Sequence, residues 1–241
     1  MINEKIHIFK DTAELSEGFT SLLKEELDNK EIVNISLSGG TTPKALFKYW
    51  TANYSKTLAW EKIAFFWGDE RCVPPEDPMS NYGMTKDLLF DLVEKIDRKK
   101  VHRIHGENEP EEEIEWYEDI MDKYLPKEND APCFDLFMLG LGDDGHTVSI
   151  FPNQISLWDN PNNCVEAKHP ETWMSRISMT GRVVNNARNI AFLVTGKNKA
   201  EKVKQIIKQR EEFFNIYPAA KVNPTNGTLH WFLDEEAASL L

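Results

Sequence analysis

The chain has 241 residues, long enough for one large α/β domain or two small ones, and for a buried core without disulfides or structural metal. Lys and Arg total 28 against 40 Asp and Glu, and the formal net charge of −12 disfavours binding to nucleic acid or to an anionic membrane. Three cysteines without CxxC spacing argue against a disulfide framework or a structural zinc site and favour a reducing, cytoplasmic location.

The first third of the chain predicts three strands and the two helices that connect them. The strands are expected at Ile6–Phe9, Ile32–Leu37 and Lys62–Trp67. The first helix starts at a capping box formed by Asp11 and Glu14. The second helix has Thr42 as its expected cap and Pro43 in its first turn, and it runs to about Tyr54. Because the third strand lacks polar alternation, we expect it to be parallel and covered on both faces.

The middle of the chain continues this alternation after a loop that contains three prolines. Ser80 or Asn81 is expected to cap the helix that follows the loop. Two strands are expected, at Val101–Ile104 and Phe134–Leu141. Between them, an acidic helix from about Pro110 to Tyr124 is expected to present a solvated face. The second strand is continuously apolar, which predicts a place near the centre of the sheet.

The last third of the chain predicts three strands and one helix. The strands are expected at Arg176–Thr180, Ile190–Thr195 and Leu229–Leu233. The helix is expected over Lys197–Phe213. Strands that alternate with helices throughout predict a mostly parallel sheet with helices on both faces, in a single domain over residues 1–241. Ligands of such sheets bind beyond the carboxyl ends of the strands, where the polar and glycine-rich segments of this chain occur.

The segment Ser38–Pro43 has the composition of a phosphate-binding turn. Gly39 and Gly40 are flexible, Thr41 and Thr42 supply hydroxyl groups, and the free N–H groups of the helix start would cradle a phosphate. The GxxxxGK[ST] spacing of a Walker A loop is missing. An ordinary strand-to-helix turn is the structural alternative.

Residues 140–145 match the letters GxGxxG, but their chemistry argues against a dinucleotide-binding loop. A pyrophosphate would meet Asp143 and Asp144, and Pro152 stops any long helix after the loop. A metal site is disfavoured because Asp143, Asp144 and His146 crowd together without a distant third partner. His146 has the setting of a general base near pH 7, with an acidic neighbour that can orient it. A packed structural histidine is the alternative.

Three cationic side chains near strand ends are candidates to bind an anionic ligand. Arg71 follows two acidic residues, so it would clamp a phosphate or form a structural ion pair with Glu70. Arg176 and Lys199 are further candidates, although either could equally be surface charge. A serine hydrolase is disfavoured because the sequence has no GxSxG elbow.

Several segments taken together, in this order, resemble the 6-phosphogluconolactonases. The segments are Leu37–Pro43, Gly68–Pro74 with Ser80–Gly83, Leu139–Thr147 with Phe151–Pro152, Val194–Glu201 and Pro224–Asp234. The resemblance implies a Rossmann-like, three-layer α/β fold that is shared with glucosamine-6-phosphate deaminases and related to ribose-5-phosphate isomerases and CoA-transferases. It also implies hydrolysis of 6-phospho-D-glucono-1,5-lactone to 6-phospho-D-gluconate in the oxidative pentose phosphate pathway, without a metal or another cofactor.

The resemblance also implies a role for each candidate site residue. The phosphate would be held by Gly39, Gly40, Thr41, Thr42, Arg71 and Lys199, and Arg176 would line the sugar site. His146, oriented through Asp144, would remove a proton from water as it attacks the lactone carbonyl. The donor that stabilises the resulting oxyanion is left unassigned.

Two other functions stay open at this point. Amino-sugar-phosphate deaminases and isomerases that resemble this chain use an extra carboxylate shortly after the Asp-Gly-His sequence, and Thr147–Phe151 supplies none. A non-catalytic sugar-phosphate-binding protein would keep the fold and turn nothing over, although the intact His146 argues against it. We expect a small-molecule partner and a monomer or small homo-oligomer.

Overall fold

A six-stranded sheet forms the centre of the computed structural model, which describes residues 2–241; Met1, the first residue of the expected domain, lies outside the described residues. Every neighbouring pair of strands is parallel, in the order β1-β11-β10-β7-β2-β3. The strands are β1 (Glu4–Phe9), β2 (Val33–Leu37), β3 (Ile63–Trp67), β7 (Leu136–Leu139), β10 (Asn189–Val194) and β11 (Thr228–Asp234). The expected parallel sheet is confirmed, with β7 near its centre as predicted.

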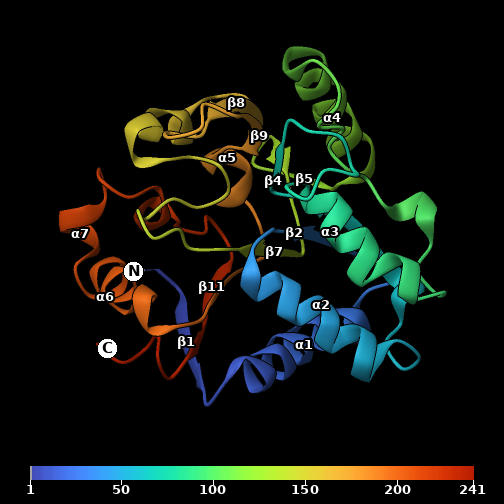
Figure 1. The fold of residues 1–241 in the computed structure, drawn as a ribbon, viewed down its shortest axis with the longest axis horizontal. Helices are drawn as coiled ribbons and strands as arrows, with labels where there is room; N and C mark the ends of the chain where they lie inside the picture. The colour runs from blue at the N-terminus through green and yellow to red at the C-terminus, as the bar shows by residue number, and fades with distance from the viewer. Residues whose placement is uncertain (1) are drawn as a thin grey trace.

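Seven α-helices within residues 2–241 flank the two larger sheets of the molecule (Figure 1). They are α1 (Thr12–Asn29), α2 (Thr41–Tyr54), α3 (Asn81–Leu88), α4 (Pro110–Tyr124), α5 (Gly181–Val184), α6 (Ala200–Lys208) and α7 (Arg210–Phe213). The cap of α1 is confirmed, because the Asp11 carboxylate accepts hydrogen bonds from the N–H groups of Ala13 and Glu14. Ser80 caps α3, since its hydroxyl oxygen accepts from the Gly83 N–H at 3.0 Å.

Three predictions about individual elements are wrong. Gly40, not Thr42, is the N-cap of α2, and its φ of 107° is one that glycine adopts at little cost. The helix expected over Lys197–Phe213 is a 3₁₀ turn followed by α6 and α7, which are separated at Gln209, where φ is −126° and ψ is 30°. The strand expected at Val101–Ile104 is only one isolated bridge, between Val101 and a residue of β3.

A second, antiparallel sheet lies beside the parallel one, at one end of the molecule (Figure 1). Its strands, in spatial order, are β4 (Asp69–Arg71), β9 (Ser175–Met179) and β8 (Cys164–Lys168), and a separate hairpin pairs β5 (Lys127–Glu128) with β6 (Ala131–Pro132). The strand expected at Arg176–Thr180 is therefore confirmed as a strand but belongs to an antiparallel sheet. Because only Gly68 separates β3 from β4, the second sheet is fixed to the carboxyl end of the first.

The core fixes the position of the loops that carry polar residues. All residues of β2, β3 and β7 are buried, which explains the continuous apolar sequences of β3 and β7, and each large buried side chain contributes about 1.5–3 kcal/mol to stability. Four strands of the parallel sheet, β2, β3, β7 and β10, end on one edge of the sheet, at Leu37, Trp67, Leu139 and Val194 respectively. Across residues 2–241, no helix combines the length and apolar character needed to cross a membrane.

Candidate active site

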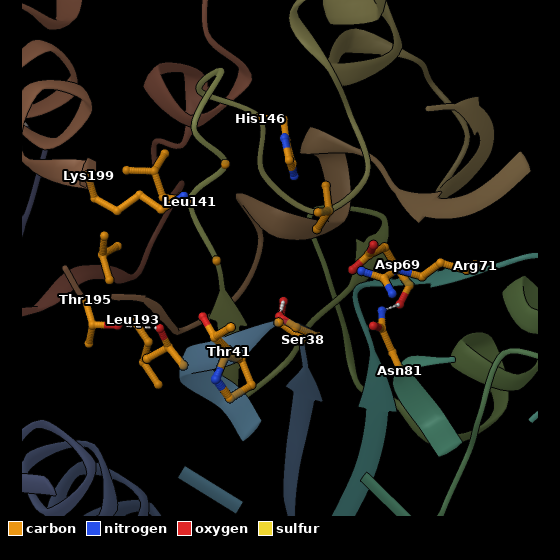
Figure 2. A pocket seen from close by; sticks show the side chains of 18 of the residues that line it. Ser38, Thr41, Asp69, Arg71, Asn81, Leu141, His146, Leu193, Thr195 and Lys199 are labelled. Atoms are coloured by element: carbon orange, nitrogen blue, oxygen red, sulfur yellow. Dashed lines mark hydrogen bonds between the residues drawn. The ribbon is translucent and has the colours of Figure 1, made fainter. Parts of the chain in front are cut away.

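A cavity of about 200 Å³ lies at the carboxyl edge of the parallel sheet (Figure 2). The loops that follow β2, β7 and β10 contribute to its wall, together with residues of β4. Most of the sequence-predicted site residues line it: Gly39, Gly40, Thr41, Thr42, Arg71, His146, Arg176 and Lys199. Asp144 is not among the lining residues, but its side chain contacts His146, which is.

The loop after β2 has the geometry of an anion-binding turn. Gly40 leads directly into α2, whose first main-chain hydrogen bond runs from the Lys44 N–H to the Gly40 carbonyl oxygen. The N–H groups at the start of this helix have no partner inside the helix and carry a partial positive charge. The hydroxyl of Thr42 lies 2.9 Å from that of Thr195, which joins this loop to the end of β10. The loop can therefore hold a phosphate against hydroxyl and N–H donors.

Contacts with Asp144 orient the His146 imidazole in a way that suits a general base. Its Nδ1 lies 2.6 Å from Oδ1 of Asp144, and the same oxygen accepts the His146 backbone N–H at 3.1 Å. Burial would raise the pKa of the Asp144 carboxyl, but its hydrogen bonds with His146 outweigh that effect and keep the pKa below its ordinary value. An ionised Asp144 fixes the proton on Nδ1, which leaves the lone pair on Nε2 to accept a proton.

The loop that carries His146 is tightly constrained. The Thr147 hydroxyl donates to the Gly140 carbonyl oxygen at 2.9 Å, and the Gly142 N–H donates to the His146 carbonyl oxygen at 2.9 Å. A Cβ atom on Gly142 would lie 2.1 Å from His146 Nδ1, so a side chain at this position would displace the base. Val148, which also lines the cavity, has a φ of 47°, a conformation that costs a β-branched residue about 1–3 kcal/mol.

Lys199 reaches the cavity from the turn after β10. Its Nζ lies 2.5 Å from Oδ1 of Asp143, to which the Asn198 side chain also donates at 3.0 Å. The hydrogen bond from Lys199 keeps the pKa of the Asp143 carboxyl below its ordinary value. Asp143 and Asp144 thus serve different partners, and within residues 2–241 no group of three or more His, Cys, Asp or Glu side chains is arranged to hold a metal ion.

Glu70 anchors the loop between β4 and α3 instead of neutralising the guanidinium of Arg71. Its carboxylate accepts the backbone N–H groups of Arg71, Asn81 and Tyr82 at 2.7–2.8 Å and the Ser80 hydroxyl at 3.2 Å. Burial raises the pKa of Glu70 to about 7, although the three N–H groups act in the opposite direction. The Arg71 guanidinium donates to the Met79 carbonyl oxygen, at the end of the same loop.

Two polar residues of the cavity, Asp69 and Asn81, received no role from the sequence. Asp69 is 4% exposed and accepts the Ser149 hydroxyl at 2.5 Å, and Ser149 Oγ lies 3.3 Å from Nη1 of Arg176. The side-chain amide of Asn81 donates to the Asp69 carbonyl oxygen at 3.0 Å. The signal for Asp69 was present in the sequence, because it directly follows the glycine that ends the third predicted strand.

The cationic side chains occupy two separate ends of the cavity. Figure 2 shows Lys199 on the same side as Thr41 and Thr195, whereas Arg71 lies on the opposite side with Asp69 and Asn81. The lining between these ends includes Ser38 and glycine backbone. The site can therefore accept an elongated ligand that carries acceptor groups at both of its ends.

Known proteins with similar sequence and structure share this fold. The family described as glucosamine-6-phosphate isomerases/6-phosphogluconolactonase matches residues 10–231. A 6-phosphogluconolactonase from Haemophilus influenzae is 45% identical over 211 residues, which cover 87% of this chain and 88% of the relative. A crystal structure of a devB protein has a TM-score of 0.93 at 40% identity and covers 98% of both chains. A monomeric glucosamine-6-phosphate deaminase, 19% identical with a TM-score of 0.81 over 98% of this chain and all of the other, shares the fold.

Proposed function

The chain belongs to the family of glucosamine-6-phosphate isomerases and 6-phosphogluconolactonases, and we propose that it hydrolyses 6-phospho-D-glucono-1,5-lactone to 6-phospho-D-gluconate in the oxidative pentose phosphate pathway. The observation that carries this proposal is the pair formed by His146 and Asp144 at a cavity that is also lined by the glycine- and threonine-rich turn at the start of α2. One base and one anchored phosphate are sufficient for ester hydrolysis by water, and because such lactones also open slowly without an enzyme, the demand on the enzyme is modest.

His146 activates the nucleophile in this reaction. Nε2 takes a proton from a water molecule while the water oxygen attacks C1 of the lactone, and the imidazolium that forms is stabilised by the Asp144 carboxylate. The proton then passes to the ring oxygen when the bond from C1 to that oxygen breaks. The reaction needs no covalent enzyme intermediate.

The substrate phosphate binds at the start of α2. The turn of Gly39, Gly40, Thr41 and Thr42 supplies N–H and hydroxyl donors, and Lys199 supplies a full positive charge. In a protein whose net charge is −12, such a local cluster is needed to attract a dianion. The three cysteines without CxxC spacing support a reducing, cytoplasmic location for this activity.

Measured turnover of the phosphorylated lactone tests the proposal. Wild-type protein is expected to open the lactone well above the spontaneous rate, and the same preparation is expected to release no ammonia from glucosamine 6-phosphate. Ammonia release would instead support the deaminase function of other members of the family. Tight binding of 6-phosphogluconate without turnover would support a sugar-phosphate-binding protein.

A further inference from the structure

The structure points to a donor for the oxyanion that the reaction creates. We infer that Arg176, with Arg71 beside it, binds the carbonyl oxygen of the lactone as that oxygen becomes negative, and then binds the carboxylate of the product. This inference rests on the proposed function, because it assigns the second half of the same cavity. The two arginines then bind the C1 end of the substrate and not its phosphate, although the sequence predicted that Arg71 would hold the phosphate.

Arg176 is a buried cation with unused hydrogen-bond donors. The residue is 7% exposed, and its Nη1 contacts the Ser149 hydroxyl at 3.3 Å. Its Nε has no hydrogen-bond partner among residues 2–241, and neither has the buried Nε of Arg71. A guanidinium carries five N–H donors, and leaving them unpaired away from water is costly. Since both residues line the cavity, their incompletely paired guanidinium groups favour an anionic ligand beside them.

The two guanidinium groups are brought together by the antiparallel sheet. Arg71 in β4 lies directly opposite Arg176 in β9, where like charges destabilise the pairing of strands. The buried carboxylate of Asp69, which accepts the Ser149 hydroxyl, offsets part of this charge. Glu70, the other acidic side chain of β4, is occupied by N–H groups at the start of α3. An anion bound between the arginines would therefore relieve a repulsion that the fold creates.

This positive end lies beside the catalytic base. The centres of the Phe151 ring and the His146 imidazole ring are 4.6 Å apart, and Cζ of Arg176 lies 5.5 Å from the centre of the Phe151 ring. The base and the guanidinium therefore flank one aromatic side chain. Figure 2 shows Arg71, the strand partner of Arg176, on the side of the cavity opposite Lys199. In the substrate, the carbonyl carbon and the phosphate lie at opposite ends of the sugar chain, which matches this separation.

Arg176 assists the addition of water to C1 and the loss of the ring oxygen from C1. The water oxygen forms a bond to C1, its proton moves to His146 Nε2, and the π electrons of the carbonyl group move onto the carbonyl oxygen, which accepts N–H bonds from Arg176. When that oxygen reforms its double bond, the bond between C1 and the ring oxygen breaks, and the ring oxygen takes the proton from His146. The acid product then releases a proton to solvent, and its carboxylate stays on the arginines until it leaves.

Two stable ligands separate the carboxylate site from the phosphate site. We would measure binding of 6-phosphogluconate and of glucitol 6-phosphate, which has the phosphate but no carboxylate, by calorimetry. Wild-type protein is expected to bind the acid about tenfold or more tightly than the polyol. Arg176→Gln should remove this preference and leave the polyol affinity unchanged. Lys199→Met should weaken both ligands by a similar factor, and Arg188→Gln, at the opposite edge of the sheet, should change neither.

Kinetics on the same variants completes the test. Loss of one oxyanion donor in Arg176→Gln should lower kcat by about 10²-fold. Because the site is buried, Arg176→Lys is the second variant: it keeps the charge and should retain part of the carboxylate preference while losing about tenfold in kcat. Two results would overturn the inference: an equal loss of affinity for both ligands in Arg176→Gln or Arg176→Lys, or a kcat that is unchanged in both variants. If wild-type protein fails to open the lactone, the proposed function is wrong, whereas the ligand comparison still decides whether Arg176 binds a carboxylate.

Discussion

The ammonium group of Lys199 lies 2.5 Å from the carboxylate of Asp143, the residue directly before the one that orients His146. The lysine side chain is 19% exposed and the aspartate side chain is 75% exposed, so the pair lies at the mouth of the cavity. Two successive carboxylates of one loop thus contact two candidate functional groups, one in the same loop and one in the turn after β10. Asp144 holds the base, and Asp143 holds the cation that we place on the phosphate.

Asp143→Asn is expected to lower KM for the phosphorylated lactone by about twofold to fivefold with little change in kcat. The carboxylate competes with the substrate phosphate for Lys199 and repels it, and an exposed ion pair of this kind is worth about 0.2–1 kcal/mol. Steady-state kinetics at low ionic strength would measure the effect, which added salt should reduce.

Asp122→Asn is the matched control for this prediction, because Asp122 pairs with Lys127 outside the cavity. It should leave KM unchanged. A higher KM in Asp143→Asn would contradict the competition and show that Asp143 is needed to position Lys199.

Gly142→Ala is expected to lower kcat by about 10-fold to 10²-fold while KM changes little. The new Cβ would lie 2.1 Å from His146 Nδ1 and 2.6 Å from Asp144 Oδ1, so the base must leave its productive position. The matched control is Gly140→Ala, whose Cβ would meet only the Ser38 hydroxyl, at 3.8 Å. Equal kcat values for the two variants would contradict the account of His146 placement.

The free energy of unfolding is expected to fall as the pH falls from about 6.5 to about 4, in part through His230. This side chain is 4% exposed, and its Nδ1 lies 3.2 Å from Nε2 of His7. Burial, followed by the charges of His7 and Lys5, lowers the pKa of His230 from 6.5 to about 4. As the pH falls, the unfolded chain therefore binds a proton on His230 at a higher pH than the folded protein does. The stability that neutral His230 contributes is complete above its unfolded pKa of 6.5, and it is lost as the pH falls towards its folded pKa of about 4.

His230→Gln should remove this part of the pH dependence. A pKa difference of this size corresponds to about 3 kcal/mol between neutral pH and pH values below 4. Urea unfolding of both proteins at about pH 8 gives the packing cost of the substitution, and the series down to about pH 4 gives its proton linkage. Parallel stability curves for the two proteins would show that His230 does not titrate as its burial implies.

Extended treatment with EDTA is expected to leave lactone turnover unchanged. His146 is sufficient to activate water, and the carboxylates nearest to it are occupied by Lys199 and by the imidazole itself. The assay compares treated enzyme with the same enzyme after addition of single divalent cations. Activity that is lost with EDTA and returns with one cation would contradict this prediction.

The sequence predicts best those elements whose signals are local. The acidic helix begins at Pro110 and ends at Tyr124 as expected, because proline at the first position and acidic residues in the first turn are signals read within one turn. All six strands of the parallel sheet were expected from short apolar or β-branched runs, and the signal is clearest in β3 and β7, which are apolar and buried along their whole length.

Elements defined by distant contacts could not be predicted in the same way. The strand β4 consists of Asp69, Glu70 and Arg71, a polar sequence that becomes a strand only because β9 pairs with it from far along the chain. That pairing is also what brings Arg71 opposite Arg176. Motifs therefore identified the residues of the cavity, whereas the separation of its two cationic ends required the structure.

Turnover by His146→Gln is the most direct test of the central claim that His146 is the base. After subtraction of the uncatalysed rate, kcat is expected to fall by about 10²-fold to 10⁴-fold relative to the wild type, with the affinity for 6-phosphogluconate kept within about threefold, because the phosphate site is separate. His7→Gln, on β1 outside the cavity, is the control for a lost imidazole and should keep full activity. A folded His146→Gln protein that turns over the lactone at nearly the wild-type rate would contradict the account.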